Sequence, residues 1–168
     1  EAKPDVVRLL GAEQVEFVRL QAMKSLTTLG SPEYAEQVSS LLAKDVPEWS
    51  RLRALSSLAE MDWKAVMPQL VPLLDSDEPE NIRTQALKVI SETGSRDSAA
   101  RETLAVLKES RTLDRILQLL QDDRADIQAA ALETLAGIHW DGPVEAILPL
   151  LRSREQVVQS AALQALQE

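Results

Sequence analysis

Residues 81–94 read NIRTQALKVISETG, an amphipathic stretch that runs into a glycine. The apolar residues Ile82, Ala86, Leu87 and Ile90 stand at spacings i, i+4, i+5 and i+8, which places them on one face of an α-helix. The glycine after the last apolar turn is a typical helix stop. The sequence therefore predicts a helix that must bury one face against a neighbour.

Four further copies of this helix follow from the same pattern, an alanine followed by a large apolar residue. The spacings between successive copies are 32, 32, 45 and 31 residues. The pairs are Ala22-Met23, Ala54-Leu55, Ala86-Leu87, Ala131-Leu132 and Ala162-Leu163. A shorter apolar segment that ends in two leucines precedes each copy. These leucine pairs are Leu9-Leu10, Leu41-Leu42, Leu73-Leu74, Leu119-Leu120 and Leu150-Leu151. A repeated pair of helices is predicted, and the two are called here the first and the second helix of each repeat.

Two features interrupt this regularity. Pro72 and Pro149 occupy the same position in their first helices, where a proline should distort the last turn. The 45-residue interval holds extra residues near 96–109, whose apolar spacing predicts an inserted helix or a lengthened first helix.

Stacked repeats of this kind predict an all-α fold in a single domain, residues 1–168, because each pair covers the apolar face of the next. The repeats are expected at approximately 4–30, 31–61, 62–94, 95–139 and 140–168. The chain begins without methionine and stops inside an apparent helix, so we expect a segment of a longer protein.

The pattern LL…D…IR…AL…L…G over about 31 residues resembles HEAT repeats, and the short period is similar to the HEAT-like repeats named after phycobilisome lyases. The resemblance covers nearly the whole chain. It implies a right-handed α-solenoid of about five helix pairs whose second helices line a concave surface. Armadillo and tetratricopeptide patterns fit less well, since a third helix and a Trp/Gly/Tyr signature are missing.

Composition excludes several kinds of chemistry. The chain has no cysteine and one histidine, so disulfides, thiol catalysis and the usual zinc sets are ruled out. No glycine-rich phosphate loop and no cofactor motif occurs, so we expect neither an enzyme nor a cofactor. The net charge of −9 disfavours nucleic acid and anionic membranes, and no apolar run could span a bilayer. A cytoplasmic and an extracytoplasmic location are both compatible with the sequence.

A row of arginines stands close to the core direction of the first three second helices: Arg19, Arg51 and Arg83. Six residues before each stands an acid: Glu13, Asp45 and Asp77. Gln128 and Gln159 take the arginine position in the last two repeats. We expect a structural ladder, in which each arginine pairs with a loop acid and with backbone carbonyls, as the HEAT resemblance also implies. The alternative is a row of arginines that binds an anionic ligand.

The outward positions of the second helices are the candidate binding surface. In the first three repeats they carry the candidate partner-binding residues Leu20, Lys24, Leu52, Arg53, Gln85 and Lys88. In the last two repeats a small-residue surface would permit a close helix neighbour, and it consists of Ala129, Ala130, Ala131, Ala136, Ala161 and Ala162. A basic column beside leucines suits an acidic, partly apolar peptide or protein. The alternative is an ordinary solvated surface.

Three functions remain open. The first is a non-catalytic protein-interaction scaffold that binds its partner on the concave surface of the second helices. The second is a chromophore-attachment module similar to phycobilisome lyases, and the third is a DNA-lesion enzyme of the HEAT-like type. Five aromatic residues and an acidic total charge disfavour the last two. Asp122, Asp123 and Asp126 form an acidic loop that would bind calcium weakly or simply begin a helix.

Overall fold

A computed structural model describes residues 3–11, 14–28, 38–60, 63–96, 105–108 and 111–167. All regular elements in these ranges are helices, and no β-strand occurs among them, which confirms the all-α prediction. The chain divides into two compact units, Glu1–Leu70 and Val71–Glu168, which are described in turn. The prediction of a single domain with five repeats stays a prediction.

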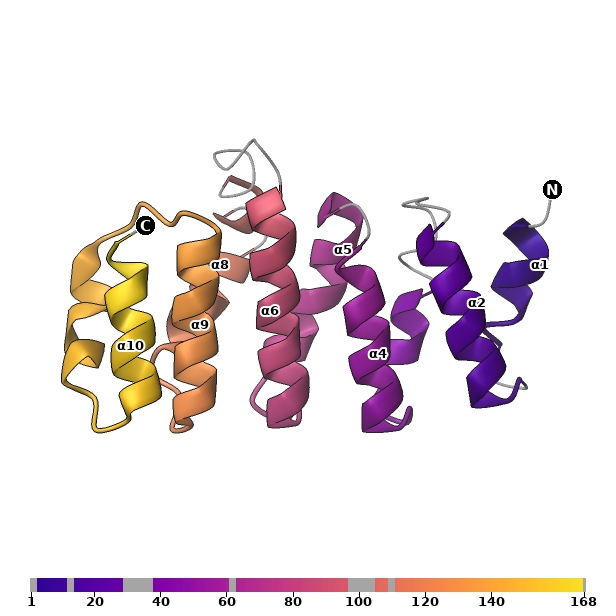
Figure 1. Ribbon diagram of the computed structural model, residues 1–168, viewed down its shortest axis with the longest axis horizontal. Helices are drawn as coiled ribbons and strands as arrows, with labels where there is room; N and C mark the ends of the chain where they lie inside the picture. The colour runs from indigo at the N-terminus through magenta and orange to yellow at the C-terminus, as the bar shows by residue number, and fades with distance from the viewer. Residues whose placement is uncertain are drawn as a thin grey trace. The chain divides into compact units, whose positions relative to one another are not determined.

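The first unit contains the first two repeats and the beginning of the third. Its elements are α1 (Lys3–Arg8), α2 (Glu16–Thr28), the 3₁₀ turn η2 (Ser40–Leu42), α4 (Glu48–Leu58) and α5 (Trp63–Leu70). The second helices α2 and α4 pack against each other, α1 contacts α2, and η2 contacts α4 (Figure 1). Each of these second helices therefore packs against a short first-helix element, α1 or η2.

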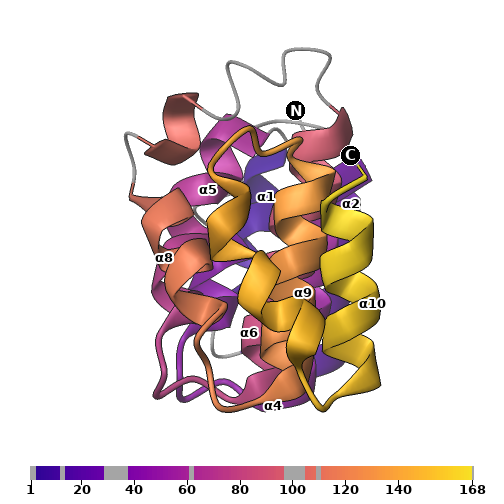
Figure 2. The same cartoon turned by 90° about the vertical axis from the view of Figure 1, so that its left-hand side faces the viewer.

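The second unit repeats this arrangement. Its elements are η3 (Val71–Leu74), α6 (Glu80–Arg96), α8 (Thr112–Leu119), α9 (Ala125–Gly137), η4 (Val144–Ala146), η5 (Leu148–Arg152) and α10 (Gln156–Ala165). The second helices α6, α9 and α10 lie side by side in this order (Figure 1). The elements η3, α8 and η5 pack behind them, and Figure 2 shows α8 in a layer apart from α9 and α10.

The core lies between these two layers of each unit. The predicted apolar positions are buried in α4, α6 and α9, and most of them have no exposed surface: Ala54, Leu55, Leu58, Ile82, Ala86, Leu87, Ile90, Ile127, Ala131 and Leu132. In α10, Val158 and Ala162 are fully buried as predicted, but Leu163 is 55% exposed. The prediction for Leu163 is wrong because α9 and η5 cover only one side of α10.

The predicted proline distortions take the form of 3₁₀ turns. In the third repeat α5 ends at Leu70, and Pro72 lies in η3. In the fifth repeat η4 and η5 replace the first helix, and Pro149 lies in η5. Proline has no N–H to donate to the carbonyl four residues before it, and its ring crowds the preceding turn, so a regular α-helix is interrupted at these positions.

The predicted insertion near 96–109 falls largely outside the described residues. Within it, residues 105–108 are helical and Leu107 is fully buried. The helix α6 continues past Gly94 to Arg96, so the predicted glycine stop is wrong by two residues. Among the described residues, no helix has the length and apolar character that crossing a membrane would need.

Candidate functional site

One position of the second helices is exposed in all five repeats. This position lies two residues after the aligned alanine of each second helix. Its occupants are Lys24, Ser56, Lys88, Glu133 and Gln164. The two other positions predicted to face outward vary among the repeats, from exposed Arg53 and Ser160 to buried Ala129 and Ala161. Side chains at the exposed position line grooves between neighbouring second helices in both units, and these grooves form the candidate site.

The first groove lies between α2 and α4 and encloses about 540 Å³. Lys24 lines it from α2 and Arg53 from α4, and Glu60 is the one carboxylate among the described lining residues. Two hydroxyls in the wall are engaged with their own helices, since Thr28 donates to the Lys24 carbonyl and Ser56 to that of Leu52. The groove therefore carries a small positive charge on a polar lining.

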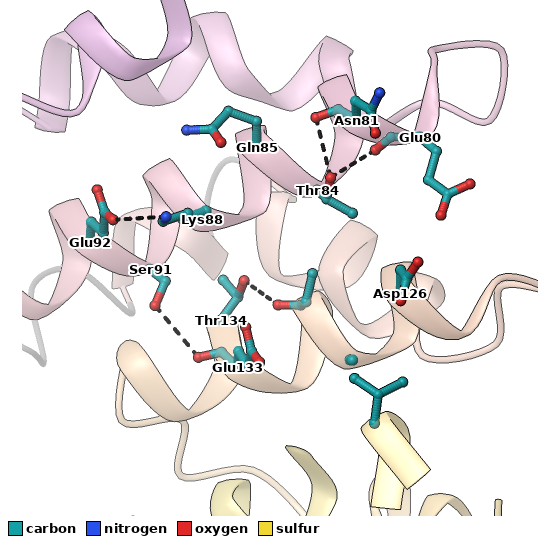
Figure 3. Close-up of a pocket in the computed structure, with 13 residues that line it drawn as sticks. Glu80, Asn81, Thr84, Gln85, Lys88, Ser91, Glu92, Asp126, Glu133 and Thr134 are labelled. Atoms are coloured by element: carbon teal, nitrogen blue, oxygen red, sulfur yellow. Dashed lines mark hydrogen bonds and ion pairs between the residues drawn. The ribbon is translucent and has the colours of Figure 1, made fainter. Parts of the chain in front are cut away.

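The second groove lies between α6 and α9, encloses about 640 Å³ and reaches Val157 on α10. Figure 3 shows its lining residues. Four carboxylates line it, and they come from Glu80, Glu92, Asp126 and Glu133. Lys88 is the one cation among the described lining residues, and its ammonium lies 3.9 Å from the Glu92 carboxylate. This groove is negatively charged.

Polar contacts and a close approach hold the walls of the second groove. The Thr134 hydroxyl lies 3.1 Å from the Leu87 carbonyl oxygen on the facing helix and is buried. Gly137 stands so near Ser91 that a methyl group at Gly137 would overlap the Ser91 hydroxyl. The helices α6 and α9 are therefore fixed close together along the groove.

The predicted partner-binding residues divide between the two grooves. Lys24 and Arg53 face the first, and Gln85 and Lys88 face the second. Leu52 is half-buried and lines neither groove, so its predicted exposure is wrong. The side chain of Leu20 lies outside the described residues.

The last repeats also differ from the outward prediction. Ala129 is 3% exposed and Ala161 is 4% exposed, although both were expected to face away from the core. Their helices pack against each other and α9 also packs against α6, so small side chains on the flanks are covered by the adjacent helix. The alanines thus lie in helix contacts of the second unit.

The arginine row faces inward. The Arg19 Nε donates to the Leu10 carbonyl at 3.2 Å, and the Arg51 Nε donates to the Leu42 carbonyl at 2.9 Å. In both repeats the acceptor is the last leucine of the pair that ends the first helix. Arg51 is 3% exposed, so this hydrogen bond satisfies a buried donor.

Arg83 is paired differently. It is 1% exposed, and its Nη2 donates to the Asp122 carboxylate at 2.5 Å, which joins α6 to the loop before α9. Its Nε and Nη1 have no hydrogen-bond partner within the described part of the chain. The acid expected for Arg83 was Asp77, which is exposed, whereas Asp122 comes from the repeat that packs onto α6.

The other members of the predicted ladder take up varied positions. Asp45 is exposed, and Glu13 lies outside the described residues. Gln128 donates to the Asp122 carbonyl and Gln159 to the Ser153 carbonyl, each at 2.8 Å. Glutamine thus replaces arginine where a shorter loop brings a backbone acceptor within reach.

Asp122 is held ionised by its surroundings. Burial disfavours its charge, but hydrogen bonds from the Arg83 guanidinium and the Arg124 backbone N–H outweigh this effect, and both arginine charges add to them. The pKa of the Asp122 carboxyl is therefore lowered. Within the described ranges, no three Asp, Glu, His or Cys side chains are placed to hold a metal ion. The structure therefore gives no support to the calcium alternative for this loop.

Sequence reasoning missed the carboxylates of the second groove. One signal was present, because Glu133 occupies the position of Lys24 and Lys88 one repeat later. Glu80 and Asp126 lie in the first turns of second helices. Acids are common there because they interact favourably with the helix dipole, so their position alone did not indicate a groove.

Comparison with known proteins gives similarity in structure only. No family model and no curated protein matches the sequence. A designed armadillo repeat protein in complex with the peptide (KR)4 superposes with a TM-score of 0.69 at 19% identity, over 98% of this chain and 80% of that one.

Two natural proteins are also similar. The complex of CpcE and CpcF of phycocyanin lyase from Nostoc sp. PCC7120 gives a TM-score of 0.67 at 21% identity, over 98% of both chains. A mutant of Kap121p gives 0.71 at 17% identity, over 95% of this chain and 18% of that one. The chain therefore has a helical-repeat fold, which confirms the predicted HEAT-like resemblance, and its structural neighbours also include armadillo repeat proteins, whose sequence pattern fitted less well.

Proposed function

We propose that this protein is a non-catalytic scaffold that binds a protein or peptide on the face formed by its second helices. The observation that carries the proposal is the pair of grooves, each between two neighbouring second helices and each lined by charged and polar side chains. Repeat proteins present such surfaces on helices that are fixed by their neighbours, which suits binding without chemistry.

The first groove gives this proposal a direct test. Lys24 and Arg53 face one another across it, and a partner segment with carboxylates would gain two charge-assisted contacts there. We propose that the acidic partner that the sequence predicts binds between α2 and α4. The half-buried Leu52 provides no exposed apolar contact beside them.

The test selects binders from a random peptide display library on the immobilised chain. Peptides that bind the first groove should lose binding to the double variant Lys24→Glu, Arg53→Glu. The control variant Arg8→Glu, Lys44→Glu makes the same change in net charge at exposed positions outside the groove. Peptides that bind both variants like the wild type would contradict a site on this face.

The chromophore-attachment alternative rests on fold likeness to the phycocyanin lyase proteins at 21% identity. A direct check is the absorbance of a linear tetrapyrrole titrated with the chain. A saturable spectral change would favour that alternative over the scaffold.

A further inference from the structure

The groove between α6 and α9 has an unusual charge for a surface that was expected to be basic. Of its lining residues, four are carboxylates and one is a lysine. The lysine is already 3.9 Å from Glu92 and 65% exposed, so it cancels little of the negative field. An acidic partner segment would be repelled here.

The carboxylates are grouped at two places along the groove (Figure 3). Glu80 and Asp126 lie at one end, and Glu92 and Glu133 lie at the other, with Gln85 and Thr84 between them. Asp126 and Glu133 are seven residues apart on α9, which puts them on one face of the helix, about 10 Å apart along its axis.

These two residues are also the ones available to a ligand. The Glu80 carboxylate forms an ion pair with the Arg124 guanidinium at 3.5 Å, and the Glu92 carboxylate forms one with the Lys88 ammonium. Asp126 and Glu133 are exposed, and neither carboxylate takes part in an ion pair with any residue that the structure describes.

The floor between the two ends suits a polypeptide backbone. Ala130 is half-buried and presents only a methyl group, so a chain can approach α9 closely. Gln85 is also a lining residue, and its amide offers a donor and an acceptor at once, which matches the alternating groups of a main chain.

We propose that this groove binds an extended segment of another protein, in the polyproline II conformation, that carries two Lys or Arg side chains three residues apart. A polyproline II chain has three residues per turn and advances about 3.1 Å per residue, so these two side chains lie on one face about 9 Å apart, close to the separation of Asp126 and Glu133. This inference rests on the proposed scaffold function and names the chemistry of one of its partners.

The experiment measures fluorescence anisotropy of labelled Gly/Ser peptides with the intact chain at low salt. The probe carries two arginines three residues apart, and its matched control carries two glutamates at the same positions. The arginine peptide should bind, the glutamate peptide should bind at least tenfold more weakly, and added salt should reduce binding of the arginine peptide.

Isosteric neutral variants locate the site. In Asp126→Asn, Glu133→Gln we expect affinity for the arginine peptide to fall about fivefold or more, from two exposed ion pairs. The control Asp114→Asn, Glu145→Gln removes the same charge from exposed positions of the same unit outside the groove and should change affinity less than twofold. Since Asp126 lies in the first turn of α9, the single variant Glu133→Gln tests the groove without touching a helix end.

Several outcomes would overturn the inference. These are equal loss in both double variants, equal binding of the glutamate peptide, absence of binding at low salt, and displacement of the peptide by spermine at equal affinity, which would indicate a small polyamine. The scaffold function is judged separately by the display selection. Library peptides of another chemistry that depend on a groove would uphold it while this inference fails.

Discussion

The pair of Arg83 and Asp122 connects α6 to the loop before α9, and its removal gives the most direct test of the packing in the second unit. In Asp122→Ala the Arg83 guanidinium stays where it is 1% exposed, but its counter-charge is gone. The Nε and Nη1 atoms already have no hydrogen-bond partner among the described residues, so Nη2 would join them.

The expected loss follows from these contacts. Breaking a buried ion pair by removing one partner costs about 3–5 kcal/mol. The Arg124 backbone N–H donates to the Asp122 carboxylate at 3.0 Å. Loss of this acceptor should lower the free energy of unfolding by about 1 kcal/mol more. The Asp122 side chain is 15% exposed, so water relieves part of this, and we expect about 4 kcal/mol in total. For a chain of this size the melting temperature should fall by roughly 10 °C.

Urea unfolding followed by far-ultraviolet circular dichroism measures this loss. Asp122→Asn keeps the shape and an acceptor oxygen and should lose about half as much as the alanine variant. The control Asp123→Ala changes the exposed neighbouring acid and should stay within about 0.5 kcal/mol of the wild type.

A double variant separates the pair from its surroundings. In Arg83→Met, Asp122→Ala no buried charge is left, so the double variant should be more stable than Asp122→Ala alone. If Asp122→Ala proves as stable as Asp123→Ala, the guanidinium must find water or another partner, and the reasoning from burial fails.

Three further predictions concern buried contacts in the two units. Because the pKa of Asp122 is lowered from its ordinary value of 3.8, its contribution to stability is complete well above pH 3.8 and is lost as the pH falls through the lowered folded-state pKa. The stability difference between the wild type and Asp122→Asn should therefore shrink from pH 6 to pH 2.5 in urea titrations. Gly137→Ala should lose about 1–2 kcal/mol by overlap with Ser91, and a background of Ser91→Gly should remove most of that loss in a double-mutant cycle. Arg51→Ala should lower the melting temperature, with a loss of about 1–3 kcal/mol, because the Leu42 carbonyl loses a buried donor; an unchanged melt would show that this hydrogen bond is dispensable.

Much of the fold could be predicted from the sequence because it depends on short-range periodicity. Ala54, Ala86 and Ala131 are buried as their helical spacing indicated, since each repeat has the same nearest neighbours. Pro72 and Pro149 also distorted the segments in which they stand, because the missing N–H is a local property.

The flanks of the helices could not be predicted in this way. A helical wheel divides residues into inward and outward, but Leu52 is half-buried and Ala129 is buried although both were expected to face outward. The partner of Arg83 shows the same limit. The spacing of six residues within one loop indicated Asp77. The acid that pairs with Arg83 is Asp122, which lies 39 residues after Arg83 in the next repeat.

The charge of the grooves is a property of two neighbouring repeats and not of one column. Lys24, Arg53 and Lys88 look alike when the repeats are aligned, yet Lys24 and Arg53 share a groove in which they outnumber the acid, whereas Lys88 faces acids from its own helix and from α9. A binding surface made between repeats can therefore change sign along one chain while every repeat keeps the same core. We expect substitutions at the exposed position to leave the packing intact, since the arginine and glutamine side chains that bind the loops lie on another face of each helix. The partner proposed for each groove therefore has to be derived from the residues of both helices that form it.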